Sequence, residues 1–310
     1  MVVCLAGAGF SKWAAGLPVA RDLFDWSIVP FGPREEAKLR DVRTLKALWD
    51  KERPDGHAEE FVDYALGHDE RSAAAVQWYV VRRLSEPYIW REWQSGRWRR
   101  HVLMIDESRK WKRPGVTEAQ RFLAQILGGY LSGVVTTNYD LLIEYALGTR
   151  GFNYGSVGER LYGRGPYPLS QWRNPVVLRG ELPLAKVHGS ISWDDEGRYT
   201  DGRRGLSGRA LIVPPGPGKE PPEELAHQWE LAGAVLRRTT RLVVFGFAFN
   251  DYDRAFLVHL GRHGEGLRNV LLSDVAPNER SAQRLWPRAR VESVLPPPEG
   301  EARVVEWLRG

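Results

Sequence analysis

Short apolar runs alternate with longer amphipathic stretches along this chain of 310 residues. Several of the apolar runs show no alternation with polar residues, as expected of strands whose two faces are both covered by helices. The pattern therefore predicts an α/β fold with a mostly parallel sheet and helices on both faces. Strands are expected at 2–7, 133–138, 184–189, 210–214, 241–247, 268–274 and 290–295.

The amphipathic stretches predict the helices that cover this sheet. They lie near 17–27, 116–129, 139–148, 222–238, 252–262, 277–286 and 301–308. The interval between the first two strands is too long for one crossover helix, and residues 33–115 look mostly helical. We therefore expect a helical subdomain at 33–115, inserted into a sheet domain formed by 1–32 and 116–310.

The second half of this insert, residues 71–113, has an unusual composition. It holds eleven Arg or Lys against four Asp or Glu, and five of the 13 tryptophans of the chain. One interpretation is a helical cap with its tryptophans in the core and its arginines in solvent. A protein interface is the second, because Trp, Tyr and Arg dominate binding hot spots. Nucleic-acid contact is the third, since the charge is favourable and aromatic rings stack on bases.

Charge and cysteine content exclude several classes of protein. The net charge of +5 is too small by itself to indicate nucleic-acid binding. Cys4 is the sole cysteine, which excludes a disulfide framework and a four-cysteine zinc site. No apolar run approaches the roughly 20 residues that span a bilayer, and the first residues lack the features of a signal peptide. We therefore expect a cytoplasmic protein without membrane contact.

The residues of chemical interest lie where the predicted strands end. In an open parallel sheet, ligands bind in the crevice at the carboxyl ends of the strands. The first strand ends in Gly7-Ala8-Gly9-Phe10-Ser11. Two glycines allow a tight turn that approaches a pyrophosphate, and the following helix N-terminus favours its negative charge. The alternative is a plain strand-to-helix turn, because Lys12 stands where the dinucleotide fingerprint has its third glycine.

Four later strands end in polar groups of the same kind. These are Thr136-Thr137-Asn138-Tyr139-Asp140, Lys186-Val187-His188-Gly189-Ser190, Gly246-Phe247 with the acids up to Asp253, and Asp274. Asn138 or Asp140 can cap the helix that follows. His188 can accept a proton near neutral pH, or it can be a buried histidine with satisfied hydrogen bonds. Asp274 can bind ribose hydroxyls, although helix capping explains Asp253 and Asp274 equally well.

The order and spacing of these groups resemble those of the sirtuin-like NAD-consuming proteins. Those proteins carry a GAG-x-S turn, a T-x-N-x-D loop, an HG pair, a G-[YF]-[SA] segment followed by acids, and a late acidic or polar strand end. This chain shows GAGFS, TTNYD, KVHGS, GFAFNDYD and LLSD in that order across most of residues 1–275. The resemblance implies a Rossmann-like domain that binds NAD as its substrate.

The resemblance also implies a role for each matching position. The implied catalytic residues are Asn138, at the nicotinamide ribose, and His188, the base at the ribose hydroxyl or the attacking water. The implied pyrophosphate cradle is the turn of Gly7, Ala8, Gly9, Phe10 and Ser11. The other implied NAD contacts are Thr137 and Asp140 near the nicotinamide, Gly246 and Phe247 near the adenosine, Asp274 at the adenine ribose, and Pro18 and Arg21 in a loop over the nicotinamide ribose.

Three departures separate this chain from the deacylases of that family. Sirtuin deacylases carry a zinc module of two cysteine pairs, which one cysteine cannot build, so no metal is expected. The loop TTNYD stands where deacylases generally have TQNID, and the insert at 33–115 is longer than a cofactor-binding loop needs. The chain resembles instead the bacterial sirtuin-like NAD hydrolases of anti-phage defence, in which water captures the sugar.

The resemblance therefore implies an NAD glycohydrolase that releases nicotinamide and ADP-ribose. A zinc-less NAD-dependent protein deacylase and a non-catalytic sensor of NAD or ADP-ribose stay open as alternatives. Unregulated NAD hydrolysis would kill the host, so we expect a switch. Either a homo-oligomer or a separate partner can supply it, such as a helicase-like DNA-translocating ATPase or a short Argonaute-type protein.

Overall fold

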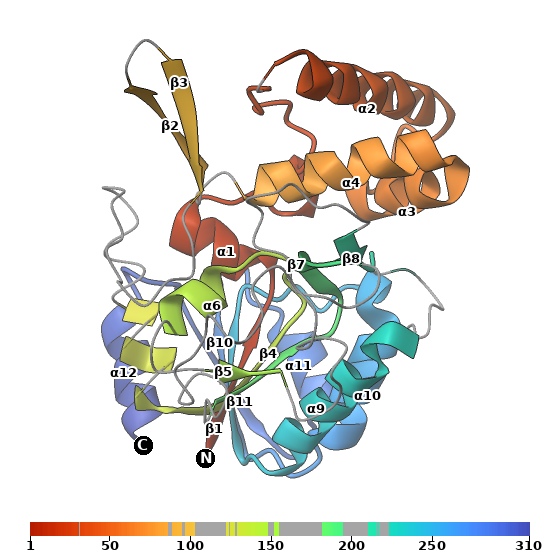
Figure 1. Ribbon diagram of the computed structural model, residues 1–310. Coiled ribbons are helices and arrows are strands. Elements are labelled where there is room, and N and C mark those ends of the chain that lie inside the picture. Colours follow the sequence, from red (N-terminus) through yellow and green to blue (C-terminus); the bar gives the residue numbers. More distant parts are fainter. Residues whose placement is uncertain are drawn as a thin grey trace.

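A seven-stranded parallel sheet forms the centre of the molecule (Figure 1). In spatial order its strands are β11 (Arg290–Val294), β10 (Asn269–Ser273), β9 (Arg241–Phe245), β1 (Val2–Ala6), β4 (Leu131–Thr136), β6 (Leu182–Lys186) and β5 (Phe152–Asn153). The computed structural model describes residues 1–30, 32–85, 89–94, 97–102, 122–123, 125–127, 129–147, 152–154, 182–194, 210–214, 216 and 223–310. The predicted α/β fold with a Rossmann-like parallel sheet is confirmed.

Strand β1 lies in the middle of the sheet because all of its residues are apolar and buried. It pairs in parallel with β4 and β9, and Cys4 lies opposite Val134 on one side and Val243 on the other. Strands β4, β5 and β6 extend the sheet to one side, whereas β9, β10 and β11 extend it to the other. The strand order therefore reverses between β1 and β9, which is the position where open α/β sheets bind ligands.

Helices cover both faces of this sheet. Figure 1 shows α9 (Ala226–Arg237) and α10 (Arg254–His263) on one side, and α6 (Leu142–Leu147) and α12 (Glu301–Arg309) on the other. The remaining elements of the sheet domain are α1 (Ala8–Ala15), α11 (Glu279–Leu285) and the 3-10 turns η1 (Ala20–Asp22), η4 (Glu223–Leu225) and η5 (Asp251–Asp253).

The first helix differs from the prediction, which placed it near 17–27. Helix α1 begins directly after the glycine turn and ends at Ala15. Gly16 terminates it in the left-handed conformation, with φ of 67°, and donates its N–H to Lys12 O. The residues near 17–27 contain only the short turn η1.

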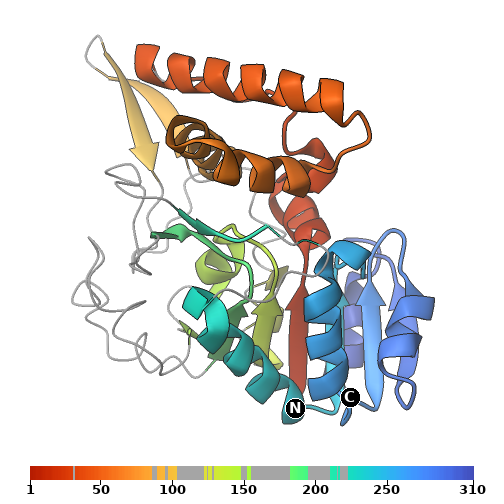
Figure 2. The same ribbon diagram turned by 90° about the vertical axis from the view of Figure 1, so that its right-hand side faces the viewer.

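Three helices of the inserted segment lie above the edge at which the strands of the sheet end (Figure 1, Figure 2). They are α2 (Pro33–Glu52), α3 (Ala58–His68) and α4 (Glu70–Leu84). In α2 the buried positions Leu39, Val42, Leu45 and Trp49 recur every three or four residues, which places them on one face of the helix. The helical prediction is confirmed for these residues, and the insert covers the carboxyl ends of the strands.

Two antiparallel pairs correct the sequence-based prediction. Residues 89–102, expected to be helical, form the hairpin β2 (Ile89–Gln94) and β3 (Arg97–Val102). Aromatic and β-branched residues favour strands, and here each strand finds its partner within a few residues. The strand expected at 210–214 is β8 (Ala210–Ile212), which pairs with β7 (Gly189–Asp194) outside the main sheet. The helix expected at 116–129 and residues 103–115 lie mostly outside the described residues.

Candidate functional site

Three glycines let the turn after β1 and the turn after β9 meet at the reversal point of the sheet. The N–H of Gly7 donates to Phe245 O at 2.9 Å, and that of Gly9 donates to Gly246 O at 3.0 Å. A Cβ on Gly7 would lie 2.6 Å from Gly246 O, and a Cβ on Gly246 would lie 2.3 Å from Phe10 N. These glycines are required by the contact between two backbones, so the N–H groups of Gly7 and Gly9 are already used within the protein.

Ala8 is the residue of this turn that faces outward. It is exposed at the start of α1, and among the described residues its N–H has no partner. The side chain of Phe10 is buried and packs against Trp13 and Phe245, while the buried Ser11 points toward the loop after β4. In the predicted pyrophosphate cradle, the N–H of Ala8 is therefore the donor available to a ligand. The side chains of Phe10 and Ser11 point into the protein, where they pack or form hydrogen bonds.

A buried hydrogen-bond network joins α1 to the loop after β4. Asn138 Nδ2 donates to Gly7 O and to Ser11 Oγ, both at 2.8 Å. Ser11 Oγ donates in turn to Asp140 Oδ2 at 2.5 Å, and Asp140 Oδ1 accepts the N–H of Leu142 at 2.9 Å. The network fixes the Asn138 amide with its Nδ2 turned inward, which leaves Oδ1 as the atom for a ligand. Asp140 both caps α6 and holds Ser11.

A buried ion pair supports this loop from beneath. Lys186, at the end of β6, is 1% exposed and its Nζ lies 2.8 Å from Oε1 of Glu144, which is fully buried on α6. Lys186 Nζ also donates to the backbone oxygen of Asp140. Tyr154 Oη donates to the same Glu144 oxygen at 2.9 Å. The position of the Asp140 loop therefore depends on a charge pair that the sequence-based analysis did not identify.

His188 lies in the turn between β6 and β7, beside the loop after β4. Its side chain is buried, and burial lowers its pKa from 6.5 to about 4, an effect that a hydrogen bond with the Thr137 backbone opposes. The ring centroid of Tyr139 lies 6.4 Å from that of His188. At Gly189, φ is 88° and a Cβ would lie 2.0 Å from Leu211 O, so only glycine lets β7 approach β8 here. Because its pKa is lowered to about 4, the imidazole of His188 is neutral at neutral pH.

Asp253 is the residue of this site that the sequence-based analysis did not assign. Its Oδ1 lies 3.4 Å from His188 Nε2, is buried, and has no hydrogen-bond partner among the described residues. Burial and then the charge of Glu59 raise the pKa of Asp253 from 3.8 to about 7. Both pKa shifts favour uncharged forms, so His188 and Asp253 face each other as a largely neutral pair.

Helix capping does not explain Asp253. The side chain of Asn250 caps η5 by accepting the N–H of Asp253, and the Asp253 side chain caps neither η5 nor α10. The acids that follow GFAF in the sequence were the feature that could have identified it. Their pairing with a histidine 65 positions earlier depends on the strand order, which local sequence does not show.

The first turn of the inserted helix α3 docks beside the His188–Asp253 pair. Tyr252 Oη donates to Glu60 Oε1 at 3.0 Å, and the Tyr252 ring lies 4.4 Å from the His57 ring, centroid to centroid. Glu59, between His57 and Glu60, is half-buried, and after burial its charge is the main cause of the raised pKa of Tyr139. The insert therefore closes over the candidate site with the acidic start of α3.

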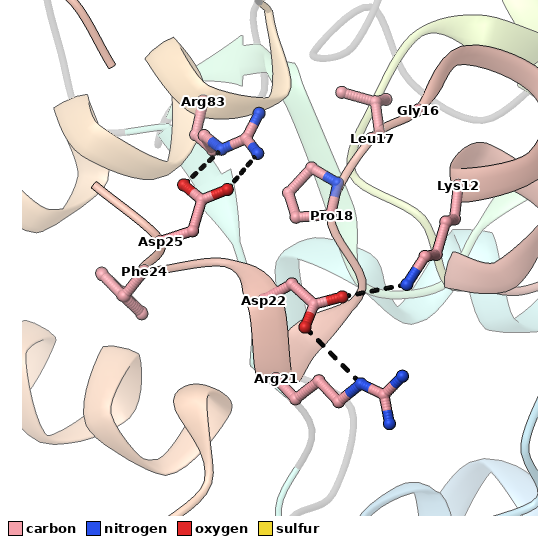
Figure 3. A pocket seen from close by; sticks show the side chains of 9 residues that line it. All are labelled: Lys12, Gly16, Leu17, Pro18, Arg21, Asp22, Phe24, Asp25 and Arg83. Atoms are coloured by element: carbon pink, nitrogen blue, oxygen red, sulfur yellow. Dashed lines mark hydrogen bonds and ion pairs between the residues drawn. The ribbon is translucent and has the colours of Figure 1, made fainter. Parts of the chain in front are cut away.

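Pro18 and Arg21 lie elsewhere, on the wall of a pocket beyond the C-terminal end of α1 (Figure 3). This pocket has a volume of about 440 Å³. Its polar residues pair with one another: Arg83 Nη2 lies 2.7 Å from Asp25 Oδ2, and Arg21 Nε lies 3.5 Å from Asp22 Oδ1. Ser11, Asn138 and Asp140 are not among the described residues that line this pocket, although Leu17, next to Pro18, donates its N–H to Ser11 O at 3.3 Å.

The end of β10 borders the crevice beside β9. Gly246 donates its N–H to Ser273 O at 3.1 Å, and Asp274 follows directly. Asp274 Oδ1 accepts the N–H of Ala276 at 3.0 Å, while Ser273 Oγ is buried without a partner among the described residues. Phe247 is buried, with its side chain in an aromatic cluster of the core. Gly246 and Asp274 thus lie at adjacent strand ends. Ser273, which was not predicted, lies between them with a buried hydroxyl that has no hydrogen-bond partner among the described residues.

Two kinds of feature are absent from the described residues. Among them, no group of three or more His, Cys, Asp or Glu side chains is arranged to hold a metal ion. None of the described helices has the length and the apolar character that a membrane span requires.

Comparison with solved structures finds proteins of the Sir2 type. Sir2Tm bound to a propionylated peptide has 14% identity and a TM-score of 0.42, with 99% of this chain and 92% of that chain covered. A Sir2 homologue in complex with NAD has 13% identity and a TM-score of 0.43, with 99% and 89% covered. No protein-family profile and no curated protein matches the chain. At these identities and TM-scores, the case for a function rests on the residues of this chain.

Proposed function

We propose that this protein is a sirtuin-like NAD glycohydrolase, which cleaves NAD into nicotinamide and ADP-ribose. The observation that carries the proposal is the convergence of two groups at the ends of the adjacent strands β4 and β6. One is the Asn138 amide, held by its hydrogen bonds to Gly7 and Ser11, and the other is the His188–Asp253 pair. Both lie near the reversal point of the sheet, and the GAGFS, TTNYD, KVHGS and GFAFNDYD motifs carry these residues.

The polar groups that lack protein partners are suited to NAD. The free N–H of Ala8, at the N-terminus of α1, is a donor for a pyrophosphate oxygen. Ser273 Oγ and the carboxylate of Asp274 lie at the neighbouring strand end, where they can bind ribose hydroxyls. Asn138 Oδ1 remains for the second ribose or for a water molecule. Among the described residues, the N–H of Ala8 and Ser273 Oγ have no hydrogen-bond partner, whereas Asp274 Oδ1 already accepts the N–H of Ala276.

Hydrolysis needs little covalent chemistry from the protein. When the bond between nicotinamide and ribose breaks, its electron pair leaves with nicotinamide, and the sugar develops positive charge at its anomeric carbon. A water molecule forms the new bond to that carbon and loses one proton. The protein has to orient the ribose, stabilise the developing charge and accept the proton. In this scheme, the Asn138 amide, held by its hydrogen bonds to Gly7 and Ser11, orients the ribose.

The His188–Asp253 pair supplies the base. Alone, a histidine with a pKa of about 4 is a weak base at neutral pH. Asp253, whose raised pKa of about 7 lies close to neutral pH, can give up and take up a proton through the pair. We therefore propose that the proton lost by the water molecule is accepted by the pair, and that hydrolysis requires both His188 and Asp253.

The position of α3 favours water over a protein substrate. His188 is 6% exposed and Asp253 is 8% exposed, with the first turn of α3 docked beside them through Tyr252. Water can reach such a buried pair, whereas an acylated peptide would have to displace the helix. This is the observation that supports hydrolysis over deacylation.

The test is to incubate the purified protein with NAD and to measure nicotinamide and ADP-ribose, with and without an acylated peptide. The proposal expects release without the peptide and a loss of at least about 100-fold in Asn138→Ala, His188→Ala and Asp253→Asn. Release only in the presence of the peptide would indicate a deacylase. Tight NAD binding without release in any oligomeric state would indicate a sensor.

We further propose that the enzyme is a cytoplasmic effector of anti-phage defence that a partner or self-assembly activates. Homo-oligomerisation and a separate ATPase or Argonaute-type partner are the two forms of control implied by the resemblance. The basic segment at 71–113 is the proposed contact for such a partner or for nucleic acid. Light scattering of the protein alone, and NAD consumption after mixing with each partner, distinguish these forms of control.

A further inference from the structure

We propose that Glu59, on the first turn of the inserted helix α3, is a positioning residue that holds a proton on Asp253 and so sets the protonation of the His188–Asp253 pair. The proposal rests on the function proposed above for that pair. It assigns a task at the site to the inserted segment, which none of the strand-end motifs includes.

The docking of α3 places Glu59 at the pair. His57 and Glu60 both contact Tyr252, the residue directly before Asp253, by a ring contact at 4.4 Å and a hydrogen bond at 3.0 Å. Glu60 also accepts the N–H of His57 at 3.3 Å, which closes a capping box and fixes this turn of the helix. Glu59 lies between two anchored residues, so its backbone position is determined.

The charge of Glu59 acts on Asp253 and Tyr139, whereas burial and then the anchored neighbour Glu60 raise the pKa of Tyr252. Next to burial, the charge of Glu59 opposes ionisation of both Asp253 and Tyr139, and Glu59 is half-buried itself. The titratable groups that face Asp253 are His188 from the β6–β7 turn, Tyr139 after β4, and Glu59 from α3. Burial raises the pKa of Glu59 itself, and in its ionised form Glu59 favours the protonated form of Asp253.

An orphaned atom supports this interpretation independently. Asp253 Oδ1 is buried and lacks a hydrogen-bond partner among the described residues, although it faces His188 Nε2 at 3.4 Å. A carboxylate without a donor would be costly in such a place, whereas a protonated carboxyl group tolerates it. Burial is the first cause that keeps the proton on Asp253, and the charge of Glu59 acts in the same direction.

The experiment is a pH profile of nicotinamide release in wild-type protein and in Glu59→Gln. Removing the charge is expected to move the acid limb of kcat/KM to lower pH by about half a unit or more. Glu60→Gln is the matched control: the glutamine oxygen can still accept the N–H of His57 and its amide N–H can donate to Tyr252 Oη, while the same charge is removed one residue away. Glu59→Asp restores the charge and is expected to return the limb toward the wild-type position.

A second measurement does not depend on catalysis. The ¹⁵N resonances of His188, assigned with a His188→Gln sample, report the titration of the neighbouring Asp253 in wild-type protein, Glu59→Gln and Glu60→Gln. A lower inflection in Glu59→Gln alone supports the proposal, even if the wild-type protein releases no nicotinamide and the proposed function fails. Identical inflections in all three proteins would overturn it, whatever the activity.

Discussion

At the scale of single residues, the buried polar groups of the candidate site are of two kinds. Ser11, Asn138 and Asp140 satisfy one another through short hydrogen bonds, which fixes their geometry. His188 and Asp253 face each other at 3.4 Å, and Asp253 Oδ1 has no hydrogen-bond partner in the part of the chain that the structure describes. An incompletely satisfied buried pair is costly, and folded proteins keep such pairs mainly where their chemistry is used.

The opposite pKa shifts of His188 and Asp253 predict opposite pH dependences of stability. In Asp253→Asn, His188 remains, and its folded pKa of about 4 lies below its ordinary value of 6.5. The stability from this shift is present above pH 6.5 and is lost as the pH falls toward 4. In His188→Gln, Asp253 remains, and its folded pKa of about 7 lies above 3.8. Its contribution is present below pH 3.8 and is lost as the pH rises through 7.

Urea unfolding at pH 5 and pH 6.5 checks this prediction. Between pH 6.5 and pH 5, Asp253→Asn is expected to lose between about 1 and 2 kcal/mol, and His188→Gln to gain a similar amount. The wild-type protein is expected to change less, because the two effects oppose each other. Slopes of the same sign in both variants would contradict the assigned protonation states.

Gly246 and Gly16 offer a matched test of close backbone approach. Both adopt left-handed conformations, with φ of 57° and 67°, but a Cβ on Gly16 would meet no atom within 4 Å. Gly16→Ala is therefore expected to cost about 1 kcal/mol from backbone conformation alone. Gly246→Ala adds a clash with Phe10 N and is expected to cost about 3 kcal/mol or more. Equal losses in urea unfolding would show that the two turns can separate.

Sequence reasoning located most residues of the site but not Asp253. Ser11, Asn138, Asp140 and His188 are found because strand ends in a parallel sheet meet at one edge. Whether the Asp253 carboxylate caps a helix or faces a histidine depends on which strands are neighbours. That information lies in the pairing of β6, β4, β1 and β9, which is set by the whole chain.

At the scale of elements, the buried pair of Lys186 and Glu144 links β6, α6 and the Asp140 loop. Lys186→Met leaves the Glu144 carboxylate buried without its cation and is expected to cost about 3 to 5 kcal/mol. The double variant Lys186→Met/Glu144→Leu removes both charges and is expected to recover more than half of that loss. Urea unfolding of the two variants gives both values.

The same double variant separates stability from positioning. It still lacks the donor to the Asp140 backbone oxygen, so nicotinamide release is expected to stay low although the fold is restored. Full activity in a stable double variant would show that Lys186 has no part in placing the Asp140 loop.

The elements that sequence reasoning misplaced are those with weak or non-local signals. Helix α1 contains four of the five residues predicted to form the glycine turn, and its end is set by the conformation of Gly16. Hairpin β2–β3 and the pair β7–β8 depend on partners that periodicity in one segment does not reveal. The central strands were predicted well, because burial on both faces leaves an uninterrupted apolar run.

At the scale of the whole molecule, the inserted helices and the sheet share one contiguous apolar core. Tyr79 Oη on α4 donates to Leu23 O at 3.3 Å, and Tyr252 after β9 donates to Glu60 on α3 at 3.0 Å. We therefore expect one cooperative unfolding transition, with coincident midpoints by tryptophan fluorescence and far-ultraviolet circular dichroism. Two separate midpoints would instead support the predicted division between 33–115 and the rest of the chain.

The central position of β1 has a consequence for synthesis on the ribosome. Strand β1 is made before both of its neighbours, β4 and β9, whose residues follow roughly 130 and 240 positions later. At a translation rate of about 5 to 20 residues per second, Gly7 waits roughly 10 to 50 seconds before its acceptor Phe245 is made. A nascent chain that ends before Phe245 lacks the turn after β9, against which the turn after β1 packs. The candidate site is therefore completed only after the residues that follow β9, including Asp253, have emerged.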